Sequence, residues 1–500
     1  MGAVHALAAD YAAQGQDDLA ALWRHFALLC DTPRRSKHEG ALRQRIADWA
    51  QAQGLAHRVD AAGNLILAKP ASPGCEDAPG VILQGHIDMV CQANAGTRHD
   101  FATDAIQPLL RDGWLIAEHT TLGADNGIGV ALALAVLESS QLRHGPLEVL
   151  LTVDEEDGMG GAQGLAAGAL DGKLLLNLDT EDFGEFYIGC AGGLDANVTH
   201  DAGFAPVPAG RIGARISVDG LRGGHSGMDI DSGRGNANKL LVRVLQEAAA
   251  TLPANALSLA AFAGGTARNA IAREATALLA LPAGELAALV ACAERTEAVL
   301  RTELAGIDEG VRVRVEAAEA PAQALVAAEQ AALLKALHAA PIGARRMSLA
   351  VPGVVETSNN LGTMRLDATG FAANLMVRSL VDSAAQALGE EIASLFALAG
   401  CEVALAGHYP GWRPNAGSPL LARCRAVFAR EFGATHGESR VKVIHAGLEC
   451  GIIGAKYPQL DMVSFGPDIR GAHAPGERVE VESVARCWHL LSAILGELTQ

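Results

Sequence analysis

The sequence predicts an α/β protein, because short apolar runs alternate with helical segments over residues 80–205. Runs typical of buried parallel strands lie at 81–83, 147–151 and 173–176. Between the first two, residues 128–138 are rich in Ala and Leu and contain no Pro, which favours a helix. An alternation of this kind indicates a three-layer α/β/α domain built around a mostly parallel sheet.

Helical periodicity precedes this region over residues 17–55, where large apolar side chains recur on one face. A linker that contains Pro and Gly follows the region at 202–208. Beyond the linker the pattern changes to strands and Ala-rich helices, at 212–218, 236–251, 284–305 and 372–377. We therefore expect an inserted α+β domain over residues 208–385.

Strand patterns return in the final segment, at 441–444 and 461–465. This segment also supplies His473, a candidate metal ligand, so we expect it to complete the first domain rather than form a third. The first domain would then consist of residues 1–207 and 386–500. Two domains suit the length of 500 residues, because single hydrophobic cores stop growing at roughly 250–300 residues.

Composition narrows the classes of function. A net charge of −18 argues against nucleic acid or an anionic membrane as a partner. The nine cysteines include no Cys-x-x-Cys pair, so a disulfide framework is not expected. The amino terminus shows no signal peptide, and the longest apolar runs, such as 128–137, are about half of a membrane span. These features predict a cytoplasmic protein.

Side chains able to bind metal follow the predicted strands in succession. They are His86, Asp125, the adjacent Glu155 and Glu156, Asp179 and His473. Ligands of open α/β sheets gather outside the carboxyl ends of the strands. Imidazoles with carboxylates suit zinc, and a carboxylate-rich set can hold two ions, which is a recurrent device for amide hydrolysis. The pattern predicts a dinuclear metallohydrolase.

Each of these positions has a structural alternative when it is taken singly. His86 and Asp88 leave the same face of a strand, so Asp88 can accept the ring N–H that does not face a metal, but the pair could also be a polar strand end. Asp125 could bridge two cations or cap a helix. Asp179 could start a turn, and His473 could be an ordinary loop histidine.

The adjacent acids point in different directions at a strand end. We expect Glu156 to bind metal and Glu155 to be the general base. The alternative is a solvated acidic surface run, because residues 154–157 are all acidic. The complete series after consecutive apolar strands favours the metal site over the separate alternatives.

A glycine-rich stretch at 220–227 places His225 in a loop of the insert. Glycines allow a backbone to approach a ligand closely. A phosphate-binding loop is excluded because no Gly-Lys-Ser/Thr ending follows. A flexible hairpin remains the alternative.

Several longer motifs resemble the M20 metallopeptidase family, in particular its branch of bacterial cytosolic dipeptidases that act on aminoacyl-histidine substrates. The most specific are Gly-His-Ile-Asp-Met-Val at 85–90, Leu-Gly-Ala-Asp-Asn-Gly-Ile-Gly at 122–129 and Leu-Thr-Val-Asp-Glu-Glu at 151–156. Further motifs lie at 189–193, 223–227, 235–239, 268–271, 409–412, 444–451 and 469–473. The resemblance covers nearly the full length. It implies a zinc-peptidase catalytic domain with an inserted lid and dimerisation domain.

The resemblance also implies two zinc ions (Zn²⁺) per chain, with Co²⁺ or Mn²⁺ as substitutes. Asp125 would bridge the ions, His86 and Asp179 would complete one site, and Glu156 and His473 would complete the other.

Roles beyond metal binding are implied in the same way. Asp88 would orient His86, and Glu155 would be the general base. His225 would stabilise the oxyanion, in its own or in a partner subunit's active site. The carboxylate end of the substrate would be held by Asn269, Arg378 and the Gly447 loop.

The function implied is that of a cytosolic, homodimeric dipeptidase that hydrolyses unblocked dipeptides, including Xaa-His, and has no nucleic-acid or membrane partner. An N-acyl amino acid deacylase or a carboxypeptidase-like hydrolase of the same fold would share the metal set, although the stretch at 444–451 favours the dipeptidase. A non-catalytic scaffold protein would be expected to lack the base or a ligand, and here all are present.

Overall fold

The computed structural model describes residues 2–500 and contains two compact units. Unit 1 comprises Met1–Gly189, Pro414–Val443 and Leu448–Gln500. Unit 2 comprises Cys190–Arg413 and the short segment Ile444–Gly447. Each unit has its own hydrophobic core.

Unit 1 is built on an eight-stranded mixed sheet with the strand order β1-β2-β6-β3-β7-β23-β8-β22. The strands are β1 (Ala56–Val59), β2 (Leu65–Lys69), β3 (Val81–His86), β6 (Leu147–Thr152), β7 (Leu174–Asn177), β8 (Glu185–Cys190), β22 (Arg440–Ile444) and β23 (Asp461–Ser464). The strands β6, β3, β7 and β23 run parallel to their neighbours in that series. The three strands predicted from apolar runs are therefore confirmed as β3, β6 and β7.

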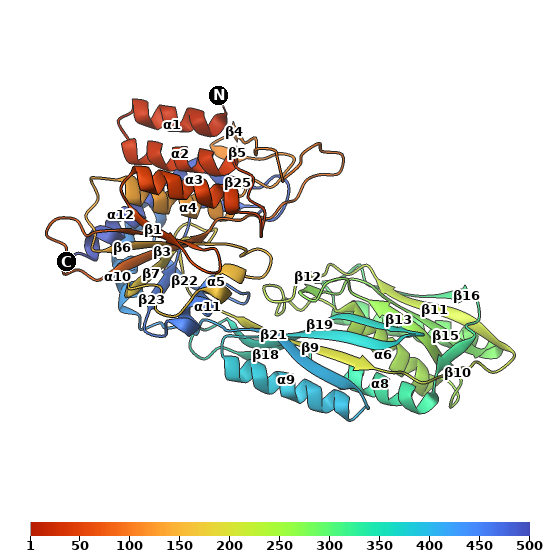
Figure 1. Cartoon of the computed structure of the whole chain (residues 1–500). Helices are drawn as coiled ribbons and strands as arrows, with labels where there is room; N and C mark the ends of the chain where they lie inside the picture. The colour runs from red at the N-terminus through yellow and green to blue at the C-terminus, as the bar shows by residue number, and fades with distance from the viewer. Residues whose placement is uncertain (1) are drawn as a thin grey trace. The chain divides into compact units, whose positions relative to one another are not determined.

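The helices of unit 1 are α1 (Ala3–Ala13), α2 (Asp17–Cys30), α3 (Gly40–Ala52), α4 (Ala124–Glu138), α5 (Gly160–Gly164), α10 (Pro419–His436), α11 (Glu449–Lys456) and α12 (Val481–Glu497). α4 packs on β3 and is covered by α2, against which α1 lies (Figure 1). This position explains why α4 is apolar on all sides, whereas α2 buries one face through Leu22, Trp23, Phe26 and Leu29. The mixed α/β class predicted from the sequence is confirmed.

A small four-stranded sheet in unit 1 has the order β24-β25-β5-β4. Its strands are β4 (Leu109–Arg111), β5 (Trp114–Ile116), β24 (Ile469–Arg470) and β25 (Arg478–Glu480). The loop between β24 and β25 carries His473, so this sheet brings the end of the chain back to the first part of the unit.

Unit 2 contains an antiparallel sheet with the order β16-β11-β15-β13-β19-β20-β9-β21, and β18 pairs with β19. Its strands are β9 (Gly192–His200), β11 (Arg211–Asp219), β13 (Ser258–Gly264), β15 (Ala275–Pro282), β16 (Arg312–Ala318), β18 (Gly343–Met347), β19 (Val355–Asp367), β20 (Gly370–Ser379) and β21 (Glu402–Tyr409). Two short pairs are β10 (Phe204–Pro206) with β17 (Gln323–Leu325) and β12 (Gly224–His225) with β14 (Ala270–Ile271). The helices are α6 (Ala237–Thr251), α7 (Leu286–Glu303), preceded by a 3₁₀ turn (Ala283–Glu285), α8 (Ala327–Ala339) and α9 (Asp382–Ala397).

The unit boundaries differ from those expected from the sequence, which placed the insert at 208–385. β9 precedes the linker that contains Pro and Gly, yet it pairs along its length with β20 and β21. The linker at 202–208 is therefore a connection inside unit 2. β21 follows residue 385 and joins the same sheet, which carries unit 2 on to Arg413. Local composition marks turns, whereas strand pairing decides which unit a segment joins.

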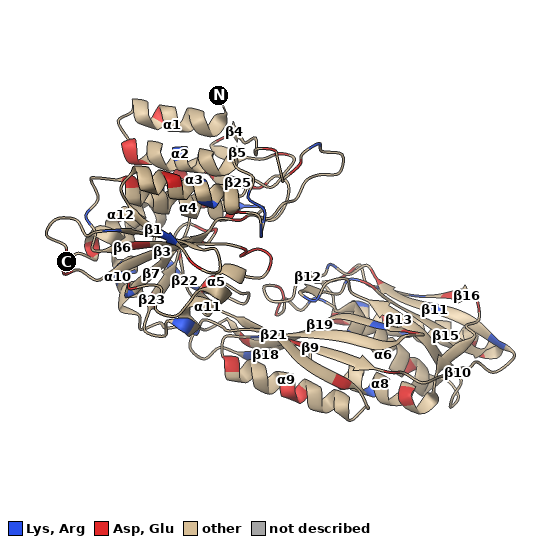
Figure 2. Ribbon diagram, viewed as in Figure 1, with Lys and Arg blue, Asp and Glu red and all other residues tan. Residues whose placement is uncertain are grey.

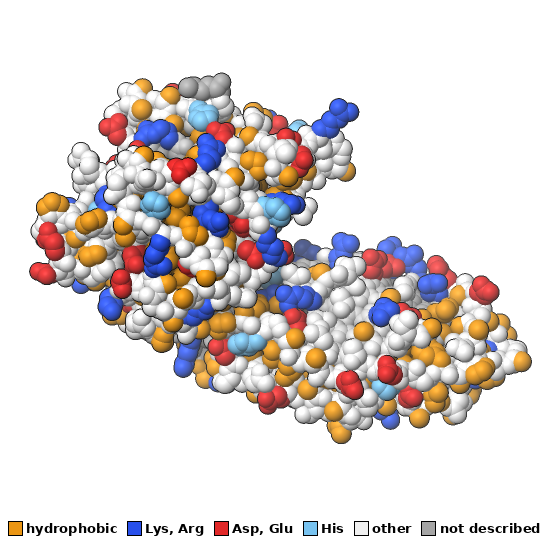
Figure 3. All heavy atoms as spheres, in the orientation of Figure 1, with side chains coloured by type: hydrophobic (Ala, Val, Ile, Leu, Met, Phe, Trp, Pro, Cys, Tyr) orange, Lys and Arg blue, Asp and Glu red, His pale blue; other side chains and the backbone are white. Residues whose placement is uncertain are grey.

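Charged side chains are distributed over both units rather than gathered in one segment (Figure 2). The face drawn in Figure 3 carries acidic and basic side chains interspersed with apolar ones. Within residues 2–500, no helix combines the length and the apolar character needed to cross a membrane.

Candidate metal centre

The candidate metal ligands all belong to unit 1 and lie at or just beyond the ends of its elements. His86 is the last residue of β3, and Asp179 follows β7 by two positions. Glu156 follows β6, Asp125 lies in the first turn of α4, and His473 follows β24. Because β3, β6 and β7 are parallel neighbours, their carboxyl ends meet at one edge of the sheet.

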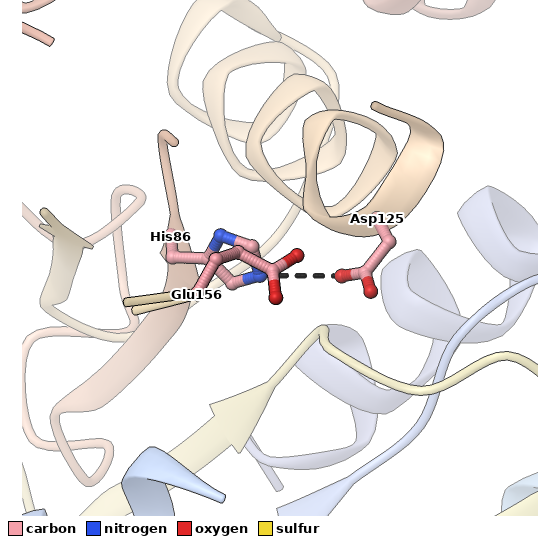
Figure 4. Close-up of side chains that lie close together, drawn as sticks. All are labelled: His86, Asp125 and Glu156. Atoms are coloured by element: carbon pink, nitrogen blue, oxygen red, sulfur yellow. Dashed lines mark hydrogen bonds and ion pairs between the residues drawn. The ribbon is translucent and has the colours of Figure 1, made fainter. Parts of the chain in front are cut away.

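The side chains form two groups that share Asp125. In the first, His86 Nε2 lies 3.2 Å from Asp125 Oδ1 and 3.5 Å from Asp179 Oδ1. In the second, His473 Nε2 lies 3.1 Å from Asp125 Oδ2 and 3.1 Å from Glu156 Oε1. His86, Asp125 and Glu156 approach one another from three different elements in Figure 4, and their ligand atoms all lie within 4.8 Å of each other.

These separations fit metal coordination. Two ligand atoms that each lie about 2.0–2.1 Å from one tetrahedral ion are about 3.3 Å apart. The measured separations in both groups, 3.1–3.5 Å, bracket this value. Since the two oxygens of Asp125 belong to different groups, the arrangement suits two ions with one bridging carboxylate.

Without a bound cation, the two ligand groups carry more negative than positive charge. Burial raises the pKa of Asp179 to about 6, and the nearby carboxylate of Asp125 adds to the rise. Contacts with Asp125 and Glu156 raise the pKa of His473 to about 11. Three carboxylates share this space with two imidazoles, and bound cations would supply the missing charge.

The contacts argue against two alternatives to metal binding, namely that Asp125 caps a helix and that residues 154–157 form a solvated surface run. The N-cap position of α4 is Gly123, and Asp125 lies inside the first turn, so Asp125 does not cap the helix. Within the acidic run at 154–157, the Asp157 side chain is 70% exposed, whereas that of Glu156 is only 7% exposed. The run is therefore not a uniformly solvated surface.

Asp88 holds several parts of the centre together. Its Oδ1 lies 3.3 Å from His86 Nδ1, the ring nitrogen that faces away from Asp125. Its two oxygens also accept the backbone N–H groups of Glu155 and Glu156, both at 3.1 Å, and Ser36 Oγ donates at 2.7 Å. Burial alone would raise the pKa of Asp88, but the His86 contact lowers it to about 2. Asp88 thus fixes the His86 ring and the turn that carries both glutamates.

Glu155 differs from its neighbour in its surroundings. Glu155 as a whole residue is partly buried, and burial of its carboxyl group raises its pKa well above the usual range. The nearby carboxylates of Asp179 and Glu156 raise it further, while His86 opposes the shift. A carboxylate with a raised pKa is suited to take a proton from water and pass it on.

The residues expected to bind substrate belong to unit 2. His225 Nδ1 accepts the backbone N–H groups of Gly227 (3.2 Å) and Met228 (3.1 Å), which favours the tautomer with the proton on Nε2, and the longer contact of Nε2 with Arg378 Nη2 is 3.5 Å. Burial, reinforced by Arg378, lowers the pKa of His225 to about 4. The ring is therefore a neutral N–H donor near neutral pH.

Arg378 belongs to β20, lies beside His225 and is 3% exposed. Its guanidinium donates to Tyr409 Oη at 3.0 Å and to Ser226 Oγ at 3.3 Å. Among residues 2–500, no carboxylate forms an ion pair with it. A buried guanidinium without an acidic partner suits an anionic ligand.

Of the other residues expected to bind substrate, Asn269 lies next to this group through its backbone. The carbonyl of Asn269 accepts the N–H of Ser226 at 2.9 Å, next to His225. Gly447 ends the segment Ile444–Gly447, which is tied to Ala191 through two carbonyls. Tyr409 and Ser226 lie in two of the motifs noted in the sequence, but no role was assigned to them, because their position beside Arg378 depends on strand register.

The chain is similar to known peptidases over nearly its whole length. A family model described as peptidase family M20/M25/M40 matches residues 82–497. The cytosol non-specific dipeptidase of Escherichia coli (strain K12) is 43% identical over 477 residues, which cover 95% of this chain and 97% of that protein. The crystal structure of aminoacylhistidine dipeptidase from Vibrio alginolyticus is 46% identical with a TM-score of 0.87, over 95% of this chain and 96% of that one. A tripeptidase from Staphylococcus aureus shares 16% identity with a TM-score of 0.55, over 96% and 98%, which is a likeness of fold alone.

Proposed function

This chain belongs to peptidase family M20/M25/M40, and we propose that it is a dinuclear zinc dipeptidase that hydrolyses unblocked dipeptides, including Xaa-His. The observation that carries the proposal is the pair of ligand groups joined by the two oxygens of Asp125, with Glu155 beside them. The dipeptidases of Escherichia coli and Vibrio alginolyticus, both above 40% identity, support the substrate class.

Five side chains would hold the metal: His86, Asp125, Glu156, Asp179 and His473. When bound, two zinc ions lower the pKa of water and polarise the carbonyl of the scissile bond, and cobalt or manganese can replace zinc at such ligands. Asp88 keeps the His86 ring in place through its Nδ1 contact.

The proton transfers are assigned to Glu155. Its carboxylate takes a proton from the attacking water and delivers it to the leaving amine, which needs a group whose pKa lies closer to neutral than that of an ordinary glutamate. Asp88 sets the position of Glu155 by accepting its backbone N–H.

The residues of unit 2 are assigned to the substrate. His225 donates its Nε2–H to the carbonyl oxygen as negative charge develops there, in its own or in a partner subunit's active site. Arg378, with Asn269 and the Gly447 loop, would bind the free carboxylate, because a guanidinium can donate two parallel hydrogen bonds. Binding of the substrate's free carboxylate at a fixed place would restrict the enzyme to short substrates.

We also propose that the enzyme is a cytosolic homodimer that associates through unit 2. The location is supported by the cytosolic relative, and sedimentation of the purified protein would test the dimer.

A substrate panel tests the function. Dipeptides, including Xaa-His, should be cleaved, while tripeptides, carboxyl-amidated dipeptides and acetylated amino acids should be poor substrates. Chelation should abolish the activity, and zinc should restore it. Preferred cleavage of acetylated amino acids would instead identify an N-acyl amino acid deacylase of the same fold.

A further inference from the structure

The loop that carries Asp125 is held by a carboxylate from the far end of the chain. Glu477 is 2% exposed, and its two oxygens accept four consecutive backbone N–H groups. Oε2 accepts from Leu122 (2.7 Å) and Gly123 (2.9 Å), and Oε1 accepts from Ala124 (2.8 Å) and Asp125 (3.2 Å). Glu477 therefore does for this loop what a side-chain cap does for an ordinary helix start.

The conformation of Asp125 makes this support necessary. Asp125 has φ −78° and ψ 113°, which is not helical, although it lies in the first turn of α4. Regular helix geometry thus does not fix the direction of its side chain. Since Glu477 satisfies the N–H groups of the loop, the Asp125 carboxylate is left free to face His86 and His473.

Arg34 holds the same loop by its carbonyls. This buried side chain donates from Nη2 to the carbonyl of Gly123 at 2.5 Å. Its Nη1 donates to the carbonyls of Ile87 and Asp88, at 3.0 and 2.7 Å. Arg34 therefore ties the Asp125 loop to the end of the strand that carries His86. A Cβ added at Gly123, whose φ is +69°, would lie 2.3 Å from Arg34 Nη2, so only glycine fits between them.

Glu477 also belongs to the loop that carries His473. Its backbone carbonyl accepts the N–H of Ala117 at 3.1 Å, and its own N–H donates to Ala474 at 3.1 Å. One residue thus joins the loop of the bridging ligand to the loop of a terminal ligand. Arg34 links the end of the strand that carries His86 to the loop of Asp125, and Glu477 links the loop of Asp125 to the loop of His473.

We propose that Glu477 and Arg34 are positioning residues that set the two carboxylate oxygens of Asp125 toward separate metal ions before metal binds. A buried carboxylate and a buried guanidinium are costly to desolvate, and an apolar core would stabilise the unit equally well. Stability alone does not explain why these two buried residues are charged, whereas their contacts with the loops that carry the candidate ligands do. The inference rests on the metal site of the proposed function, but not on its substrate.

The test is the affinity of the metal-free, full-length protein for zinc, measured by competition with a chromogenic chelator. Glu477→Gln keeps the size of the side chain but offers one acceptor oxygen, and its amide N–H₂ group would oppose two backbone donors. Loss of such supporting contacts weakens metal affinity by about 10–100-fold, which is the fall expected here. Hydrogen exchange in the metal-free state should also quicken over residues 122–125.

Glu148→Gln is the matched control. Glu148 Oε2 likewise accepts two backbone N–H groups, from Asp171 (2.8 Å) and Gly172 (2.7 Å), but in a turn that carries no candidate ligand. Its zinc affinity should equal that of the wild type. If Glu477→Gln does not fold, Arg34→Lys applies the same test, because one ammonium cannot span both sets of carbonyls.

Wild-type zinc affinity in folded Glu477→Gln would overturn the inference, as would an equal loss in Glu148→Gln. These results are separate from the proposed function. A wild-type protein that binds zinc yet cleaves no dipeptide would refute the function while leaving the positioning role standing.

Discussion

Glu155 and Glu156 are adjacent, yet their replacement by alanine should have different consequences. Glu156 Oε1 lies 3.1 Å from His473 Nε2, within a candidate metal-binding group. Glu155 contributes no atom to the contacts that define the two groups. Its backbone is held by Asp88, which accepts its N–H, and by the N–H groups of Gly158 and Met159, which donate to its carbonyl. Glu155→Ala should therefore keep the metal and lose turnover, whereas Glu156→Ala should lose both.

The size of the Glu155 effect follows from its assigned role. Removing a general base typically slows a reaction by about 10²–10⁴-fold. At about 1.36 kcal/mol per tenfold, this corresponds to about 3–5 kcal/mol of transition-state stabilisation. The fold should be retained, because burial raises the pKa of the Glu155 carboxyl group, so the ionised form is unfavourable there and its removal costs the fold little.

Metal content by atomic emission and turnover of one dipeptide, measured on the same preparations, separate the two roles. Asp157→Ala serves as the control, because Asp157 belongs to the same acidic run but its side chain is 70% exposed. It should keep both metal and activity. Metal loss in Glu155→Ala, together with retained metal in Glu156→Ala, would show that the roles are exchanged.

Two other predictions concern unit 2. Burial, with Arg378 nearby, lowers the pKa of His445 to about 3, so between about pH 3 and 6.5 the unfolded chain binds more protons than the folded one. The free energy of unfolding should therefore decrease as pH falls through this window, by at most about 5 kcal/mol from His445, and should be fully regained above it. Urea denaturation should show that the free energy of unfolding of His445→Gln falls less steeply between these pH values than that of the wild type. An unchanged slope would contradict a lowered pKa for His445. His225→Ala should lower kcat far more than it raises KM, because its contact strengthens as the oxyanion develops, and near-normal kcat would remove His225 from the reaction.

The order of strand ends explains why the sequence could predict that the candidate metal ligands lie together. His86 and Asp179 directly follow apolar runs that become the parallel strands β3 and β7, and parallel strands place their ends on one edge. The helix at 128–138 was also predictable, since its uniform apolar character matches its burial as α4.

Contacts made through the backbone could not be predicted in this way. Glu477 lies 355 positions from Leu122 and is one acid among several near the end of the chain, so no local pattern marks it. Tyr409 on β21 reaches Arg378 on β20 across β9, because both residues pair with Gly193, where a side chain would collide with the Tyr409 ring. The boundaries of unit 2 escaped prediction for the same reason, as long-range pairing of β9 decides them.

Both candidate metal sites depend on Asp125, which we propose bridges two metal ions. The most direct measurement is the number of zinc ions bound per chain, determined after reconstitution for the wild type and for Asp125→Ala. We expect two ions in the wild type and a substantial loss in the variant, because each ion would lose one of its ligands. One ion in the wild type, or two in Asp125→Ala, would contradict it.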